Sequence, residues 1–290
     1  MNPESNEPDE GGVGTTGHEW DDIKELNNPL PRWWLYTFYA TVVWAIGYCV
    51  LYPAWPGISD ATKGVLGWSS RGAVAAEMKQ VTQARAELVG RVEATPVEQL
   101  PNDPELMRFA VEGGKSAFKI YCVQCHGSGA AGGKGYPNLN DDDWLWGGNL
   151  AAIHQTLQHG IRATDDEGTR MSMMPAFGRD GMLNHAQIGD VVEHVRRISG
   201  QSFDAAMARR GAGVFAEQCA ACHGPAGNGD RKIGAPNLTD AIWLYGGDRE
   251  TLARTVYGPR GGVMPAWQQR LDPATVKQLA AYVHSLGGGE

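Results

Sequence analysis

The pattern Cys-x-x-Cys-His occurs twice in the sequence, at Cys122–His126 and at Cys219–His223. Two cysteines spaced three apart lie on one side of a helical turn, where both sulfurs can reach the two vinyl groups of one porphyrin. The adjoining histidine can then place its imidazole on the iron. This is the attachment pattern of a c-type haem; the alternatives are a redox dithiol or half of a zinc site. Two intact copies favour the haem.

The motifs therefore predict two covalently bound haems c. Their attachment points and proximal ligands would be Cys122, Cys125, His126, Cys219, Cys222 and His223. The fifth cysteine, Cys49, lies in an apolar run, so no pair is left for a structural disulfide. In c-type cytochromes haem is attached on the outer side of the energy-coupling membrane, so the resemblance of these motifs implies a periplasmic or equivalent location for this part of the chain.

The regions around the two motifs repeat one another. In each copy a Gly precedes the first Cys by eight residues and a Phe precedes it by four. Matched stretches follow each His: Pro137–Leu139 and Pro236–Leu238, Trp144–Gly148 and Trp243–Gly247, then Met174–Phe177 and Met264–Trp267. Each copy ends in a predicted helix with apolar positions at three-to-four spacing, capped by Asn184 or Asp272. The pattern indicates duplication of a whole domain.

Both copies resemble class I cytochrome c. The resemblance implies a compact helical fold, in which a C-terminal helix packs across the helix that carries the haem motif. It also implies that Met174 and Met264 are distal ligands, whose thioethers complete six-coordinate iron and raise its potential. Met171 and Met173 are close rivals of Met174, but only Met174 precedes Pro-Ala. Each Met can serve the haem of its own copy or that of the other copy.

The same resemblance implies supporting roles for four further residues. Pro137 and Pro236 would each offer a backbone carbonyl to the proximal histidine, and this would fix the tautomer of the imidazole. Trp144 and Trp243 would pack on the haem edge and point their indole N–H groups toward a propionate. The remaining histidines near helix ends are predicted to lie on the surface: His185, His194 and His284.

A run of twenty residues without a charge, Trp33–Tyr52, precedes the repeats. As a helix it would span about 30 Å, the thickness of the hydrocarbon core of a bilayer, and aromatic residues crowd both of its ends. The segment before it is acidic and no small-residue cleavage site follows, which favours an uncleaved anchor over a signal peptide. Lys24 and Arg32 precede the run and the next basic residue is Lys63, which predicts a cytoplasmic N-terminus.

Charge is concentrated at the N-terminus. The chain carries a net charge of −8, and residues 1–31 hold eight acidic side chains and one Lys. Residues 1–19 have few large apolar residues and are predicted to be disordered. Residues 73–92 show helical spacing of apolar positions, which predicts a helix that packs on its own chain or on a partner. Nowhere does a basic face suggest nucleic-acid binding.

A second resemblance comes from the N-terminal region. The stretches His18–Glu25, Asn27–Trp34 and Gly64–Trp68 are similar to the dihaem subunit of cbb3-type cytochrome c oxidases, the CcoP or FixP family. The match runs from about residue 18 to the C-terminus in order, spacing and duplication. A generic anchored dihaem cytochrome would share the haem motifs without this N-terminal signature.

This resemblance implies an electron-transfer subunit with no catalytic acid, base or nucleophile of its own. Electrons would enter from a soluble or membrane-bound c-type cytochrome and pass through the two haems toward the monohaem subunit and the haem–copper catalytic subunit. The alternatives are a stand-alone anchored dihaem carrier and a dihaem peroxidase. A peroxidase needs an iron with an open coordination site, and a distal Met for each haem argues against it.

The predicted fold class is all-α: one N-terminal transmembrane helix followed by two tandem class I cytochrome c domains, held at the bacterial inner membrane. The predicted divisions are an acidic cytoplasmic tail at 1–31, an anchor at 32–55, a linker at 56–103, a first cytochrome domain at 104–200 and a second at 201–290.

Overall fold

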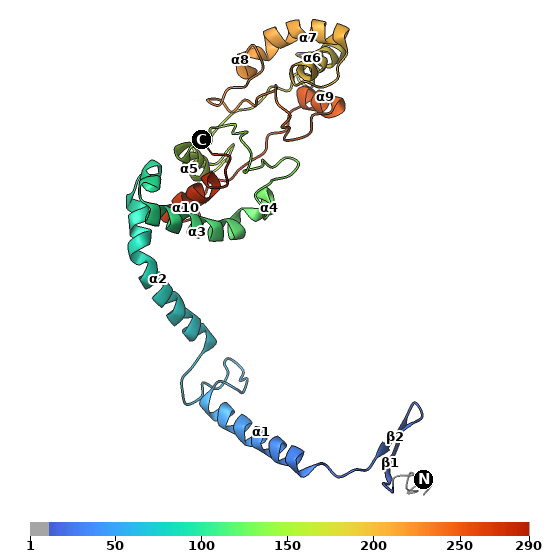
Figure 1. Ribbon diagram of the computed structural model, residues 1–290, viewed down its shortest axis with the longest axis vertical. Coiled ribbons are helices and arrows are strands. Elements are labelled where there is room, and N and C mark those ends of the chain that lie inside the picture. Colours follow the sequence, from blue (N-terminus) through green and yellow to red (C-terminus); the bar gives the residue numbers. More distant parts are fainter. Residues whose placement is uncertain (1–11, 290) are drawn as a thin grey trace. The chain divides into compact units, whose positions relative to one another are not determined.

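The computed structural model describes residues 12–289, and within them the chain is rich in helices (Figure 1). The elements are β1 (Thr15–Trp20), β2 (Ile23–Leu26), α1 (Arg32–Leu51), α2 (Ser70–Ala94), the 3₁₀ helix η1 (Val97–Asn102), α3 (Pro104–Tyr121), α4 (Val123–His126), α5 (Leu150–His159), α6 (His185–Ile198), α7 (Ala205–Gln218), α8 (Ala220–His223), α9 (Arg249–Tyr257) and α10 (Pro273–His284). The expectation of an all-α chain is not exact, because β1 and β2 form a small sheet. The chain divides into two compact units between Ala84 and Arg85, within α2.

The first unit begins with an antiparallel hairpin in which Trp20 pairs with Ile23. Its turn residues, Asp21 and Asp22, both have positive φ values, 48° and 64°. Asp tolerates this left-handed region, and a two-residue turn of this hand matches the twist of the strands it joins. The expectation of disorder through residue 19 is therefore wrong from Thr15 onward; residues 1–11 lie outside the described part of the chain.

The predicted anchor contains α1. Among residues 12–289 this is the one helix long and apolar enough to cross a membrane, and none of its residues is buried within the protein. The loop that follows turns back on the end of the helix: the amides of Val65 and Leu66 donate to the carbonyls of Val50 and Leu51 at 2.9 and 3.1 Å. Two carbonyls that a helix end leaves unpaired are thereby satisfied.

The predicted amphipathic helix is α2, and its two ends differ. Val74 and Met78 near its start are exposed, whereas Leu88 and Val92 near its end pack into the core of the second unit. The C-terminal end of α2 therefore packs on its own chain.

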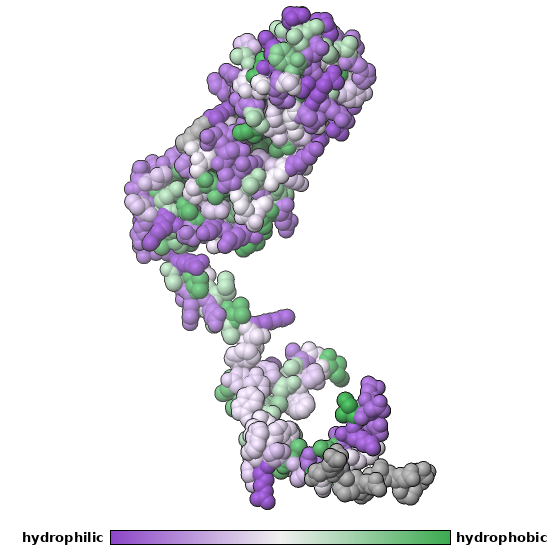
Figure 2. Space-filling view, turned by 45° about the vertical axis from the view of Figure 1, so that its right-hand side comes forward, coloured by the Kyte–Doolittle hydropathy of each residue, from purple (hydrophilic) through white to green (hydrophobic). Residues whose placement is uncertain are grey.

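The second unit contains two lobes, each with its own apolar core. The first lobe (residues 85–160 and 264–289) combines η1, α3, α4 and α5 with the C-terminal helix α10. The second lobe (residues 174–258) combines α6, α7, α8 and α9. In Figure 1, α10 (red) lies beside α3 (green), and α7 (orange) beside α6 (yellow). The visible surface of this unit is mostly hydrophilic, with scattered apolar residues (Figure 2).

The two lobes do not follow the two sequence repeats. The helix that ends the first repeat, α6, packs on the helix that begins the second, α7. The helix that ends the second repeat, α10, returns to the helix that begins the first, α3. Two crossing segments, residues 161–173 and 259–263, connect the lobes. The predicted boundary between two cytochrome domains at residue 200 stays a prediction. It separates the two sequence repeats, whereas each packed core contains helices of both repeats.

Within each lobe the two long helices cross at a glycine. A Cβ on Gly114 of α3 would overlap the carbonyl oxygen of Gln278 in α10, and a Cβ on Gly211 of α7 would overlap that of Asp190 in α6. The missing side chain lets the two backbones touch. The repeated Gly of the sequence is thus the crossing point of each helix pair.

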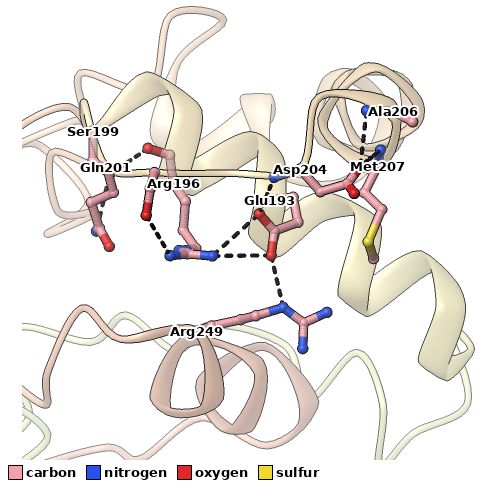
Figure 3. A network of polar contacts seen from close by, with 9 residues as sticks. Glu193, Arg196, Ser199, Gln201, Asp204, Ala206, Met207 and Arg249 are labelled. Atoms are coloured by element: carbon pink, nitrogen blue, oxygen red, sulfur yellow. Dashed lines mark hydrogen bonds and ion pairs between the residues drawn. The ribbon is translucent and has the colours of Figure 1, made fainter.

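An ion-pair network ties α6 to the rest of the second lobe (Figure 3). The carboxylate of Glu193, 3 % exposed, accepts from Arg196 at 3.1 Å and from Arg249 of α9 at 2.7 Å. It also accepts from the amide of Asp204, just before α7, at 2.8 Å. In the first lobe Lys277 of α10 holds the end of α2 instead, by donating to the carbonyls of Glu93 and Thr95.

Candidate haem sites

The first Cys-x-x-Cys-His motif lies where α3 ends and the short helix α4 begins. The amide of Cys122 donates to Phe118 at the end of α3, and the amides of Cys125 and His126 donate back to the carbonyl of Cys122 at 3.2 and 2.9 Å. This single turn brings the two cysteines to one side. Gly127, with φ +76°, then ends the turn.

The second motif repeats this geometry at the end of α7. Cys222 and His223 donate to the carbonyl of Cys219 at 3.1 and 2.9 Å, and Gly224 with φ +75° ends the turn. The duplication seen in the sequence is therefore a duplication of local structure. Each motif presents two thiols and an imidazole from one helical turn, which is the arrangement that a covalent haem requires.

The histidines of both motifs are oriented by backbone carbonyls. The Nδ1 atom of His126 lies 3.2 Å from the carbonyl oxygen of Pro137, and that of His223 lies 3.0 Å from the carbonyl oxygen of Pro236. A carbonyl only accepts, so Nδ1 carries the proton and Nε2 keeps its lone pair for a metal. Burial lowers the pKa of both histidines, which favours this neutral form. The expected contact between Pro and His is confirmed.

The four motif thiols are unpaired. Burial, with a smaller contribution from the second cysteine of the motif, raises the pKa of Cys122 and of Cys219 to about 11, and Cys125 and Cys222 are exposed. Among residues 12–289 there is no group of three or more His, Cys, Asp or Glu side chains placed to hold a metal ion.

Each Met lies in the lobe that does not hold the Cys-x-x-Cys-His motif of its own repeat. Met264 packs against the core of the first lobe, which holds His126, and Met174 packs against the core of the second lobe, which holds His223. The two rivals of Met174 differ from it in burial, since Met171 is 68 % exposed and Met173 is 63 % exposed. Each lobe thus has one thiol–imidazole motif and one partly buried thioether.

Met264 is held in the first lobe by its backbone. Its amide donates to the carbonyl of Ile161 and its carbonyl accepts from the amide of Ile161, both at 3.0 Å. A Cβ on the preceding Gly160, which has φ +68°, would overlap the carbonyl of Met264. The amide of Trp267 then donates to Leu157 of α5 at 2.9 Å. The loop after the second crossing segment is thereby fixed beside α5.

The two repeated Trp residues pack on their own loops. A Cβ on Gly148 or Gly247 would lie 2.5–2.8 Å from the nearest atoms of the Trp144 or Trp243 ring. The indole N–H of Trp144 donates to the carbonyl of Gly288, and the expected contact with a haem propionate stays a prediction. The C-terminal residues, folded over the first lobe, supply this acceptor.

Sequence reasoning placed His194 wrongly. It is buried at 6 % exposure and its ring lies 4.9 Å from that of Phe215. The equivalent pair in the first lobe is Tyr282 and Phe118, with ring centroids 5.3 Å apart. Alignment of the two repeats beyond their motifs would have revealed this, because His194 and Tyr282 stand ten residues after their helix caps. His185 is exposed as expected.

A cavity of about 340 Å³ that sequence reasoning missed lies where residues 142–145 of the first lobe face residues 228–242 of the second. Burial, then the charges of Asp240 and Asp141, raise the pKa of Asp143 there to about 6, while Arg231 opposes them. Residues of both repeats thus share one electrostatic environment.

Comparison with known proteins gives family matches for the N-terminal region and for the two regions that contain the Cys-x-x-Cys-His motifs. Residues 12–59 match the family described as the N-terminal domain of cytochrome oxidase-cbb3, FixP. Residues 109–195 and 206–283 match the family described as cytochrome c oxidase, cbb3-type, subunit III.

Similar proteins match almost end to end. The chain is 55 % identical, over 95 % of both chains, to the cbb3-type cytochrome c oxidase subunit CcoP of Cereibacter sphaeroides. It is 54 % identical, over 97 % of this chain and 95 % of the relative, to subunit FixP of Azorhizobium caulinodans. The chain belongs to the CcoP/FixP family of cbb3-type cytochrome c oxidase subunits.

Proposed function

We propose that the chain is the electron-transfer subunit of a cbb3-type terminal oxidase and that it carries two covalent haems c. The observation that most supports this function is that each lobe contains one complete Cys-x-x-Cys-His turn with an oriented imidazole and one partly buried Met. Haems held in this way would supply reversible one-electron chemistry. The chain's own residues attach them, orient the imidazoles and exclude water from the iron.

The proposed haem ligands are exchanged between the repeats. His126 and Met264 would be the axial ligands in the first lobe, and His223 and Met174 those in the second. The packing of each Met against the core that holds the other repeat's histidine supports this pairing. An iron held by a His and a Met side chain would rearrange little on electron transfer and would leave no site for peroxide. The thioether attachments would come from Cys122, Cys125, Cys219 and Cys222.

The proposed setting is a bacterial inner membrane crossed once by α1, with the N-terminus in the cytoplasm and both lobes in the periplasm. The subunit would receive electrons from a c-type cytochrome and pass them toward the monohaem subunit and the haem–copper catalytic subunit. The length and apolar composition of α1 support the anchor. The family membership supports the oxidase setting and disfavours a stand-alone carrier.

The test begins with the full chain in its native membranes. After mild detergent extraction and a native gel, a haem-stained band should consume oxygen with a reduced c-type cytochrome and contain this chain with two haems. The double variant Cys219→Ala with Cys222→Ala should then hold one haem. An oxidase-free band would refute the oxidase role, and an unchanged haem-to-protein ratio would refute the second site.

A further inference from the structure

The third residue of each Trp-Leu-aromatic-Gly-Gly stretch reaches out of its own lobe. Trp146 of the first lobe lies against Gly234 of the second, where a Cβ would overlap the indole. Tyr245 of the second lobe lies against Gly135 of the first, where a Cβ would be 3.3 Å from the ring. Both glycines have positive φ, +64° and +90°. The two contacts are reciprocal, since each aromatic residue meets the glycine loop of the other lobe.

Each of these loops leads to the proline whose carbonyl contacts a motif histidine. Gly234 stands two residues before Pro236, whose carbonyl accepts from His223. Gly135 stands two residues before Pro137, whose carbonyl lies within hydrogen-bond distance of His126. Gly135 is also bonded across the lobes, because its amide donates to the carbonyl of Leu244 at 2.8 Å. An aromatic ring of one lobe therefore supports the loop that orients the imidazole of the other.

Arginines of the two crossing segments also contact these rings. The guanidinium of Arg170 lies 5.1 Å from the centroid of the Trp146 ring and also donates to the carbonyl of Ala152 in α5 at 3.1 Å. The guanidinium of Arg260 lies 3.9 Å from the centroid of the Tyr245 ring. Cations at these distances are attracted to the ring faces. Each aromatic ring thus contacts both an arginine and a glycine loop.

We propose that Trp146 and Tyr245 are crossed positioning residues: Trp146 sets the proximal histidine of the second lobe, and Tyr245 that of the first. The inference rests on the proposed two-haem function. The hydrogen bond to Nδ1 controls the basicity of a ligating imidazole and so tunes the metal it binds. When a ring is removed, the glycine loop beyond it loses its support, and the carbonyl it carries moves relative to the imidazole.

The experiment needs the two haems to be distinguishable. In the full-length chain in detergent, Cys219→Ala leaves the second haem with one thioether, and the restored vinyl group shifts its α-band to longer wavelength. Redox titration then follows each haem at its own wavelength. In this background, Trp146→Ala should shift the midpoint potential of the second-lobe haem more than that of the first, and Tyr245→Ala should give the opposite order.

Three further variants separate positioning from general damage. Gly234→Ala should reproduce the pattern of Trp146→Ala, whereas Gly133→Ala is the matched control, because a Cβ there meets no atom within 4 Å and φ is not positive. Trp146→Phe keeps a ring on the loop and should restore most of the parent potential. A variant that changes only the haem of its own lobe, or both haems equally, would overturn the proposal.

Measuring the haem content beforehand separates failure of the proposed two-haem function from failure of the role proposed for Trp146 and Tyr245. If the parent chain holds fewer than two haems, the proposed function fails. If it holds two haems and the crossed pattern is absent, only the role of Trp146 and Tyr245 fails.

Discussion

Gly211 of α7 lies so close to Asp190 of α6 that any side chain at position 211 would overlap the Asp190 carbonyl oxygen. The same relationship holds for Gly114 and Gln278 in the first lobe. These two crossings align the helices that end at the haem motifs with the helices that close each lobe. The two backbones cannot move apart locally to accommodate a side chain, since both segments are helical.

Gly211→Ala should therefore destabilise the second lobe by about 1–3 kcal/mol, the usual cost of an added methyl in a packed interior. Gly213→Ala, in the same helix, is the control: a Cβ there meets nothing within 4 Å, and the change should be neutral or stabilise by up to about 1 kcal/mol. Urea unfolding followed by haem absorbance measures both. Equal midpoints for the two variants would contradict the tight crossing.

Met264→Leu should lower the potential of the haem attached at Cys122 and Cys125, because a thioether ligand stabilises the reduced iron. The expected decrease is on the order of 0.1 V, within the ~0.8 V range over which axial ligands tune haem. Redox titration in the Cys219→Ala background, in which the second haem has one thioether and absorbs at a longer wavelength, measures this decrease. A decrease at the Cys219 haem instead would show that ligands stay within their repeats.

Met174→Leu is the complementary change and should lower the potential of the haem attached at Cys219 and Cys222. Met173→Leu serves as its control, because Met173 is exposed and should leave both potentials unchanged. A lowered potential in the control would move the ligand assignment from Met174 to Met173.

Asp143 should make stability depend on pH. Its pKa of about 6 in the folded chain exceeds the value of about 3.9 typical of unfolded chains, so the folded state binds more protons between those values. Stability should consequently fall as pH rises from about 4 to 6 and stay lower above that. Asp143→Asn removes the titrating group and should raise Tm at pH 7 with little gain at pH 4. Differential scanning calorimetry checks this, with exposed Asp142→Asn expected to keep the parent slope.

Glu193→Ala should cost the second lobe about 3 kcal/mol, because it leaves Arg196 partly buried without its anionic partner. Burial acts to raise the pKa of Glu193, yet its hydrogen bonds from Asp204, Arg249 and Arg196 lower it overall. The stabilisation is accordingly present above the unfolded pKa and is lost as pH falls through the folded one. Urea unfolding at pH 7 measures the change.

The matched control is Glu250→Ala, whose ion pair with Arg254 is 3.9 Å long and largely exposed. Exposed pairs contribute about 0–1 kcal/mol, so this variant should unfold close to the parent. A loss as large as that of Glu193→Ala would show that burial does not distinguish the two carboxylates.

Local features were predictable from the sequence because neighbouring residues determine them. The caps at Asn184 and Asp272 accept from the backbone as expected, and Asn184 completes a capping box with Gln187. The haem-motif turns likewise depend on residues next to one another. The hairpin was missed because its turn uses two Asp in left-handed conformation, where glycine or asparagine is the usual signal.

The pairing of helices between repeats was not predictable in the same way. Gly114 fits Gln278 as Gly211 fits Asp190, and Phe118 meets Tyr282 as Phe215 meets His194. Because both repeats carry the same kinds of residues at the crossing, either pairing satisfies the sequence pattern. The choice depends on the length and path of the crossing segments, which the pattern does not encode.

The return of α10 to α3 also means that the two lobes can be completed at different times as the chain is synthesised. Residues 174–258 are contiguous, so the second lobe can close as soon as α9 has been synthesised. The first lobe has its Cys-x-x-Cys-His motif at residues 122–126, but its core is not complete until α10 has been synthesised. Its cysteines are therefore synthesised before those of the second lobe but stay beside an unfinished core for longer, because the lobe that contains the N-terminal motif is completed last.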